Sequence, residues 1–157
     1  MSPNVILVMR HAEKPTDDHD PHLSPPGKER AEKLATYIPD TFGKPDFVFA
    51  AAVSKKSARP LETIEPLAAA LGLDPKTPFA DAQYAELAQL LLSDAKYANK
   101  LIVVCWHHGE IPALMRALGA KAADYPSPWD GTVFNLILKT AFAADGTVSV
   151  VPVKEPF

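Results

Sequence analysis

Residues 4–11 read Asn-Val-Ile-Leu-Val-Met-Arg-His. The segment 4–9 is apolar and rich in branched side chains, which is typical of a strand buried on both faces of a parallel sheet. It runs directly into Arg10 and His11, so two polar side chains stand where the strand leaves the core. Ligands of open parallel sheets bind beyond the carboxyl ends of the strands. This stretch therefore predicts both the first strand of a sheet and one wall of a binding site.

The remaining segments alternate between strand and helix patterns. Apolar branched runs predict strands at 46–53, 101–106, 132–138 and 147–153, and amphipathic spacing predicts helices at 24–38, 57–71, 82–97 and 110–118. Strands that alternate with helices favour an α/β fold, here a three-layer sandwich whose mostly parallel central sheet is flanked by helices. The Asp145-Gly146 turn joins the last two strands into an antiparallel edge.

Composition narrows the class of protein. A length of 157 residues predicts a single domain that spans residues 1–157. The net charge of -3 argues against a non-specific nucleic-acid binder, and no apolar run approaches the roughly 18 residues of a membrane span. Cys105 is the one cysteine, so it has no internal disulfide partner. With a start that lacks a cleavable signal pattern, these features predict a cytoplasmic protein without nucleic-acid or membrane partners. Its oligomeric state stays open between monomer and dimer.

Cationic side chains follow three of the predicted strands. They are Arg10 and His11 after the first, Lys55, Lys56 and Arg59 after the second, and His107 and His108 after the strand at 101–106. Two predicted helices also begin at these strand ends, and helix N-termini offer free backbone N–H groups to an anion. A phosphoryl group fits such a rim, because the planar guanidinium group of arginine pairs with two oxygens at once.

A histidine at this rim can be the nucleophile. A neutral imidazole nitrogen attacks phosphorus without a metal when a hydrogen bond holds the other ring N–H. Arginines and a second histidine would stabilise charge on the transferring group. We therefore expect no metal and no cofactor. His19 and His22 lie three residues apart in a loop without further well-spaced ligands, so we interpret them as solvent-exposed.

Four motifs resemble signatures of the histidine phosphatase superfamily, which is also called phosphoglycerate mutase-like. In chain order they are Val8-Met9-Arg10-His11-Ala12-Glu13, Leu23-Ser24-Pro25-Pro26-Gly27, Arg59-Pro60-Leu61-Glu62-Thr63 and Cys105-Trp106-His107-His108-Gly109-Glu110-Ile111. They are similar to the Arg-His-Gly, Leu-Thr-x-x-Gly and Arg-Ala-x-x-Thr elements and to the strand that carries the second histidine. The resemblance covers nearly the whole chain and implies a small member with little material for a lid.

The resemblance also implies roles for individual residues. His11 would be the phosphorylated nucleophile, and Arg10, Arg59 and one histidine of the 107–108 pair would complete the phosphate pocket. Ala12 departs from the usual glycine of the first motif. Spacing to Ile111 favours His107 as the second histidine, whereas the His-Gly dipeptide of the family favours His108. We slightly prefer His108 and keep both.

The general acid of this family is usually a carboxylate after the second strand–helix unit. Asp81 and Glu86 stand in that part of the chain, and Glu13 and Glu110 lie nearer the motifs. We rank Glu86 first and retain the other three carboxylates.

The resemblance and the cationic rim together predict an enzyme, a metal-independent phosphatase. Its substrate would be a phosphorylated small molecule or a phosphoprotein, including protein phosphohistidine. Two alternatives stay open on the same scaffold: a catalytically weak phosphate-binding or signalling module, and a phosphomutase. The short chain argues against the mutase, because a mutase needs a closed site that keeps water from the phosphoenzyme.

Overall fold

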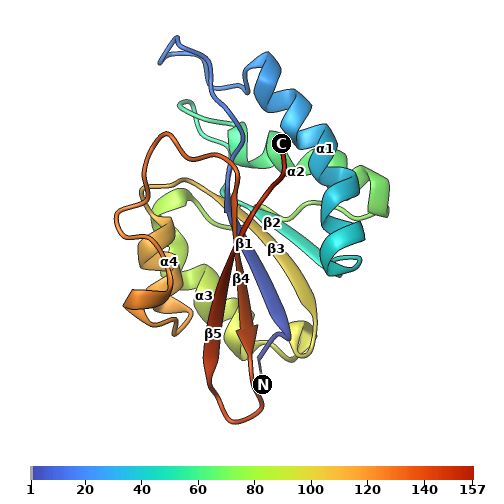
Figure 1. Cartoon of the computed structure of the whole chain (residues 1–157), viewed down its shortest axis with the longest axis vertical. Helices are drawn as coiled ribbons and strands as arrows, with labels where there is room; N and C mark the ends of the chain where they lie inside the picture. The colour runs from blue at the N-terminus through green and yellow to red at the C-terminus, as the bar shows by residue number, and fades with distance from the viewer. Residues whose placement is uncertain (1) are drawn as a thin grey trace.

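A five-stranded sheet lies between two layers of helices (Figure 1), in a computed structural model that describes residues 2–157. The strands are β1 (Val5–Arg10), β2 (Phe47–Ala50), β3 (Leu101–Trp106), β4 (Leu136–Phe142) and β5 (Val148–Lys154). Their order is β2-β3-β1-β4-β5. β2, β3 and β1 are parallel, whereas β4 and β5 add antiparallel pairs at one edge. The predicted α/β sandwich with a mostly parallel sheet is confirmed.

Four helices cover the two faces of this sheet. They are α1 (Pro25–Phe42), α2 (Arg59–Leu71), α3 (Tyr84–Ser93) and α4 (Ile111–Ala117). α1 and α2 pack on one face and α3 and α4 on the other, as the two separate apolar clusters of buried side chains show. Within residues 2–157, no helix is both long and apolar enough to cross a bilayer.

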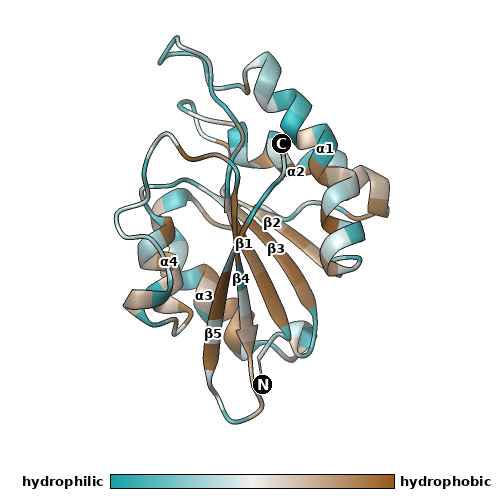
Figure 2. Ribbon diagram, viewed as in Figure 1, coloured by the Kyte–Doolittle hydropathy of each residue, from teal (hydrophilic) through white to brown (hydrophobic). Residues whose placement is uncertain are grey.

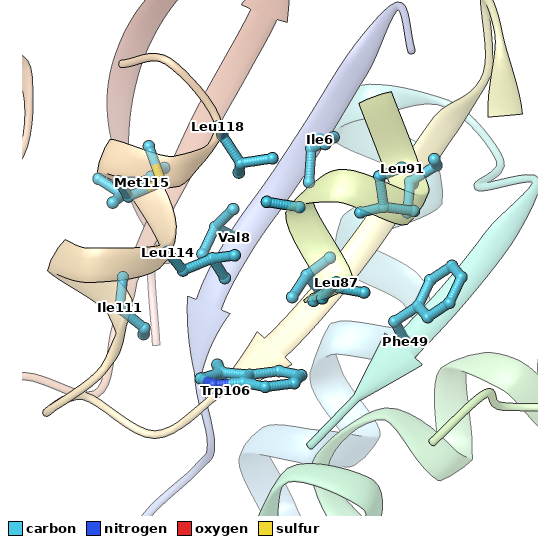
Figure 3. Packing of buried hydrophobic residues seen from close by; sticks show 14 of the residues in the cluster. Ile6, Val8, Phe49, Leu87, Leu91, Trp106, Ile111, Leu114, Met115 and Leu118 are labelled. Atoms are coloured by element: carbon cyan, nitrogen blue, oxygen red, sulfur yellow. The ribbon is translucent and has the colours of Figure 1, made fainter. Parts of the chain in front are cut away.

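Alternation along β1 explains why its sequence is apolar without a break. Ile6 and Val8 pack under α3 and α4, whereas Leu7 and Met9 pack under α1 and α2, so both faces of the strand are buried. Figure 2 shows the strands as the apolar centre of the molecule, and Figure 3 shows Ile6 and Val8 beneath side chains of α3 and α4. Such burial on both faces stabilises the sheet and fixes the place where β1 ends.

Several predicted elements have different limits in the structure, among them the strand predicted at 46–53, which spans only Phe47–Ala50. The helix predicted at 24–38 continues through Pro39 to Phe42, where the Phe42 ring packs edge-on against Tyr37. The helix predicted at 82–97 splits after Ser93, because Asp94 leaves helical geometry and accepts a hydrogen bond from the backbone N–H of Lys96. The strand predicted at 132–138 begins only at Leu136.

The late start of β4 has a cause in the binding site. Residues 129–135 form a loop in which the indole N–H of Trp129 donates to the carbonyl of Val133 at 3.0 Å. The same loop contacts Arg10 through Gly131 and Phe134. These contacts replace strand pairing, so an apolar run that looks like a strand in isolation forms a loop packed against Arg10.

Candidate active site

The carboxyl ends of β1, β2 and β3 lead into one open cleft of about 460 Å³. The arginines and histidines that the sequence places at this rim line it: Arg10, His11, Arg59, His107 and His108. Lys14, Lys56, Asp81 and Glu110 also line the cleft. Residues far apart in the chain therefore meet at one rim because parallel strands end at the same edge of the sheet.

Arg10 is the last residue of β1, and its guanidinium group is buried between two loop residues. Nη1 donates a 2.6 Å hydrogen bond to the carbonyl of Gly131, and the carbon of the guanidinium group lies 3.9 Å from the centre of the Phe134 ring. Nε is buried without a hydrogen-bond partner. Burial, and next the Arg59 charge, lowers the pKa of Arg10 to about 10, so the group stays cationic at neutral pH. The guanidinium group of Arg10 is thus held in place, and its Nε–H has no hydrogen-bond acceptor.

His11 lies directly beyond β1 and is held on both sides. Its backbone N–H continues the pairing with β3 by donating to the carbonyl of Trp106 at 3.2 Å. Nδ1 lies 2.7 Å from the carbonyl oxygen of Ala12. Because a carbonyl only accepts, Nδ1 must carry the proton, which leaves the lone pair on Nε2. Burial lowers the pKa of His11 to about 3, and the hydrogen bond to Ala12 offsets only part of that effect. The imidazole is therefore neutral at neutral pH.

Arg59 begins α2, and its side chain is fixed by the loop before α1. Nε donates to the carbonyl of His22 at 3.1 Å, and Nη2 donates to the carbonyl of Asp20. Four residues later, Oγ1 of Thr63 donates to the carbonyl of Arg59 at 2.7 Å. The guanidinium group is nearly buried and directed by two backbone carbonyls, so its position in the cleft depends on the loop at 12–23.

The motif at 23–27 anchors that loop to the start of α1. Ser24 caps the helix by accepting from the N–H of Gly27, and its N–H and hydroxyl both donate to the carbonyl of Glu13. A Cβ on Gly27 would lie 2.3 Å from that same carbonyl oxygen. Only glycine therefore permits this close approach between the helix start and the segment that follows His11.

A partly buried ion-pair network holds Glu13 away from the cleft. The guanidinium group of Arg30 donates to both carboxylate oxygens of Glu13, at 2.9 and 3.1 Å, and to the carboxylate of Glu155 at 2.8 Å. Burial raises the pKa of Glu155 to about 7 despite this pairing. Glu13 is thus occupied by a structural partner and does not line the cleft, so the structure removes it from the candidate acids.

The two consecutive histidines differ in their surroundings. The ring of His107 lies edge-on to that of His11, with 5.3 Å between the ring centroids. Burial and the Arg59 charge lower the pKa of His107 to about 4. Nε2 of His108 instead lies under Gly131, within 3.5 Å of where a Cβ would stand. Both rings line the cleft, and the His107 ring is the one that lies edge-on to His11.

The carboxylates are placed differently from the sequence ranking. Glu86, ranked first from the sequence, is exposed on α3 and does not line the cleft. Asp81 and Glu110 do line it. The indole N–H of Trp106 donates to the backbone carbonyl of Asp81 at 2.9 Å, and Oδ1 of Asp81 is buried without a partner. Burial, and to a smaller degree Glu110, raises the pKa of Asp81 to about 6. Asp81 is therefore a carboxyl group that titrates near neutral pH.

Sequence reasoning missed the contact between Phe134 and Arg10. Phe134 falls inside the strand predicted at 132–138, whereas the sequence leaves Trp129-Asp130-Gly131 open between a pocket lining and a loop packed on the sheet. Cys105 is fully buried in β3, and burial raises the pKa of its thiol. Within residues 2–157, no group of three or more His, Cys, Asp or Glu side chains is arranged to hold a metal ion.

Comparison with known proteins shows which solved structures share this fold. No protein-family model matches the sequence, and no curated protein matches it. Among solved structures, a mycobacterial glucosyl-3-phosphoglycerate phosphatase in complex with inorganic phosphate has a TM-score of 0.64 and 14% identity, covering 98% of this chain and 97% of that chain. A phosphoglycerate mutase from Plasmodium falciparum has a TM-score of 0.64 and 13% identity, covering 94% and 87%. The chain has the histidine phosphatase fold.

A third structure extends this likeness to a small phosphatase. The protein histidine phosphatase SixA, complexed with tungstate, has a TM-score of 0.59 and 17% identity, and 96% of each chain is covered. The resemblance noted in the sequence is thus confirmed at the level of the histidine phosphatase fold. In this chain that fold gathers two arginines and three histidines at one cleft.

Proposed function

We propose that the protein is a metal-independent phosphatase that hydrolyses a phosphomonoester through a phosphohistidine intermediate on His11. The observation that carries this proposal is the hydrogen bond from Nδ1 of His11 to the carbonyl of Ala12, at the base of a cleft lined by Arg10, Arg59 and His107. It fixes the tautomer in which Nε2 is nucleophilic. The neighbours named for phosphatases, with bound phosphate or tungstate, support a tetrahedral anion as the ligand.

In the first step, the lone pair on Nε2 of His11 attacks phosphorus as the bond to the ester oxygen breaks. Arg10 and Arg59 are cationic groups fixed by neighbouring carbonyls, so they stabilise the charge on the phosphoryl oxygens without reorganising. His107 is neutral in the free protein and gains a proton more readily once a phosphoryl dianion lies beside it. It then donates to the transferring group.

Asp81 is the group we assign to the leaving oxygen. Its protonated carboxyl group donates a proton to the departing alkoxide, and the resulting carboxylate then accepts a proton from water in the second step. That water attacks phosphorus, the bond to Nε2 breaks, and inorganic phosphate leaves. An alcohol leaving group needs this proton far more than an imidazole does, so a carboxyl group in the cleft favours a phosphomonoester over protein phosphohistidine.

The open cleft favours hydrolysis over intramolecular transfer. A mutase must exclude water from its phosphoenzyme, whereas here the cleft is bounded by the exposed segments that carry Lys14 and Lys56. Water therefore resolves the intermediate.

The test is turnover of an aryl phosphate by His11→Asn. We expect a loss of at least ~10³-fold in kcat, because the nucleophile is absent. We also expect the wild-type protein, quenched in alkali, to gain the mass of one phosphoryl group that acid then removes. His19→Ala is the matched control, since this exposed histidine belongs to the same loop. EDTA should leave the rate unchanged.

Two results would reject the proposal. Equal rates for His11→Asn and the wild type would exclude His11 as the nucleophile. Phosphate binding by calorimetry, without turnover of any phosphomonoester, would instead support the phosphate-binding module.

A further inference from the structure

Resting on the proposed function, we propose that the substrate carries a second anionic group on its leaving group and that Lys14 and Lys56 select it. Both lysines line the cleft beside the phosphoryl-binding arginines, and both are exposed. They are specificity-determining residues for a phosphomonoester whose alcohol also bears a carboxylate or a further phosphate. Neither lysine has a part in the proposed attack on phosphorus.

The backbone under each lysine is held in place. Lys56 belongs to a tight turn in which Ser54 and Ser57 exchange backbone hydrogen bonds, and the hydroxyl of Ser54 accepts from the N–H of Lys56 at 3.2 Å. Lys14 follows Glu13, whose carbonyl accepts two hydrogen bonds from Ser24 and whose carboxylate is paired with Arg30. The two ammonium groups therefore start from fixed points at the mouth of the cleft.

The charges of both lysines are uncompensated. Within residues 2–157, neither Lys14 nor Lys56 forms a salt bridge. Arg10 and Arg59 already supply two positive charges for the phosphoryl dianion. Two further cations at the same mouth, in a chain whose net charge is -3, exceed what one phosphoryl group needs. The surplus fits a second anion on the same ligand.

The positive and negative side chains of the cleft also come from segments on opposite faces of the sheet. Lys14 and Lys56 lie on the segments that lead from β1 to α1 and from β2 to α2, on one face. Asp81 and Glu110 lie on the segments that lead into α3 and α4, on the opposite face. A leaving group that presents its ester oxygen to Asp81 therefore has its other anionic group attracted towards the lysines and repelled by Glu110.

The test compares two esters whose leaving phenols have similar acidity: phenyl phosphate and 3-carboxyphenyl phosphate. For the wild type we expect kcat/KM to be about tenfold higher for the carboxylated ester, the effect of two exposed ion pairs. The double variant Lys14→Met/Lys56→Met should bring this ratio close to one, and Lys14→Glu/Lys56→Glu should bring it below one. Lys100→Met, at the opposite end of β3, should keep the wild-type ratio.

Each outcome has one meaning. A wild-type ratio near one, or a ratio that the double variants leave unchanged, overturns the inference while hydrolysis of phenyl phosphate keeps the phosphatase. Equal loss of both rates in the double variants also overturns it, because the lysines would then act only on the shared phosphoryl group. Failure of the wild type to hydrolyse either ester, with no phosphoenzyme, overturns both proposals.

Discussion

The backbone N–H of Ala12 donates a 2.9 Å hydrogen bond to Oγ1 of Thr63, fifty-one residues further along the chain. Thr63 in turn donates to the carbonyl of Arg59, so one hydroxyl group links the segment after His11 to the first turn of α2. Both residues are buried. This side chain is thus one of the contacts that set the position of His11 relative to Arg59.

Replacement of Thr63 by valine keeps the shape and removes the hydroxyl group. The N–H of Ala12 would be left buried without a partner, so we expect a loss of about 1–3 kcal/mol in the free energy of unfolding and a lower kcat/KM for an aryl phosphate. Urea denaturation measures the first effect. Thr63→Ser should restore most of both, and Thr36→Val, on the exposed face of α1, should change neither. Wild-type stability in Thr63→Val would contradict this role.

Gly27→Ala tests the close approach between α1 and Glu13. The added Cβ would lie 2.3 Å from a backbone oxygen, so the helix start or the loop must move. We expect a loss of about 1–3 kcal/mol in the free energy of unfolding, measured by thermal or urea denaturation. Gly109→Ala is the control, because nothing lies within 4 Å of its Cβ position. An equal effect of the two substitutions on the free energy of unfolding would show that the close approach of Gly27 to Glu13 does not determine stability.

Phe134→Leu tests the aromatic support of Arg10. Leucine retains apolar contact but removes the ring that lies 3.9 Å from the guanidinium carbon. We expect inorganic phosphate to bind about 2–30-fold more weakly, measured as the inhibition constant of phosphate against an aryl phosphate. Phe157→Leu removes a ring near Arg30 instead, outside the cleft, and should leave that constant unchanged. An unchanged inhibition constant of phosphate in Phe134→Leu would show that the Phe134 ring does not help Arg10 to bind phosphate.

Alanine substitutions separate the two consecutive histidines. His107 lies beside His11, so His107→Ala should lower kcat by about 10²–10³-fold, as loss of a donor to the transferring group does. His108 lies under Gly131, and His108→Ala should cost less than about tenfold. Steady-state rates with one aryl phosphate decide between them. A larger loss in His108→Ala would restore the preference drawn from the sequence.

The pH dependence should report Asp81. The pKa of this carboxyl group is raised to about 6, first by burial and then by Glu110. In the proposed mechanism its protonated form donates the proton. We therefore expect kcat/KM for phenyl phosphate to fall as pH rises through this value. With a pKa of about 3, His11 stays deprotonated over this range, so it adds no acid limb between pH 4 and 6.

Glu110→Gln tests whether the charge of Glu110 raises the pKa of Asp81 and so shifts this pH profile. Loss of its negative charge favours ionised Asp81 and lowers the pKa of that carboxyl group, so the alkaline limb should move to lower pH. The ionisation of the substrate is common to both enzymes, so the difference between the two profiles belongs to the protein. A shift to higher pH, or no shift, would remove Asp81 or its interaction with Glu110 from the mechanism.

Local pattern was sufficient for most of the fold. The strand at 101–106 has the predicted limits, because it is a continuous apolar run that lies inside the sheet between β2 and β1 and is buried. The order of motifs also predicted that Arg10, His11, Arg59 and the two histidines would share a cleft, since parallel strands end at one edge. Lys56, one of the cationic side chains that follow the second predicted strand, lines that cleft as well.

The sequence by itself determined the alternation of strands and helices, the motifs at the strand ends and the histidine that follows β1, because each of these depends on residues close together in the chain. Tertiary structure alone decided which neighbouring histidine faces His11, which carboxylate enters the cleft, and that residues 129–135 support Arg10 instead of extending β4. The reason is physical. Beyond the end of a strand, and in irregular segments, the directions of side chains follow no periodicity. The contact between Arg10 and Gly131 also joins residues that are 121 positions apart in the chain.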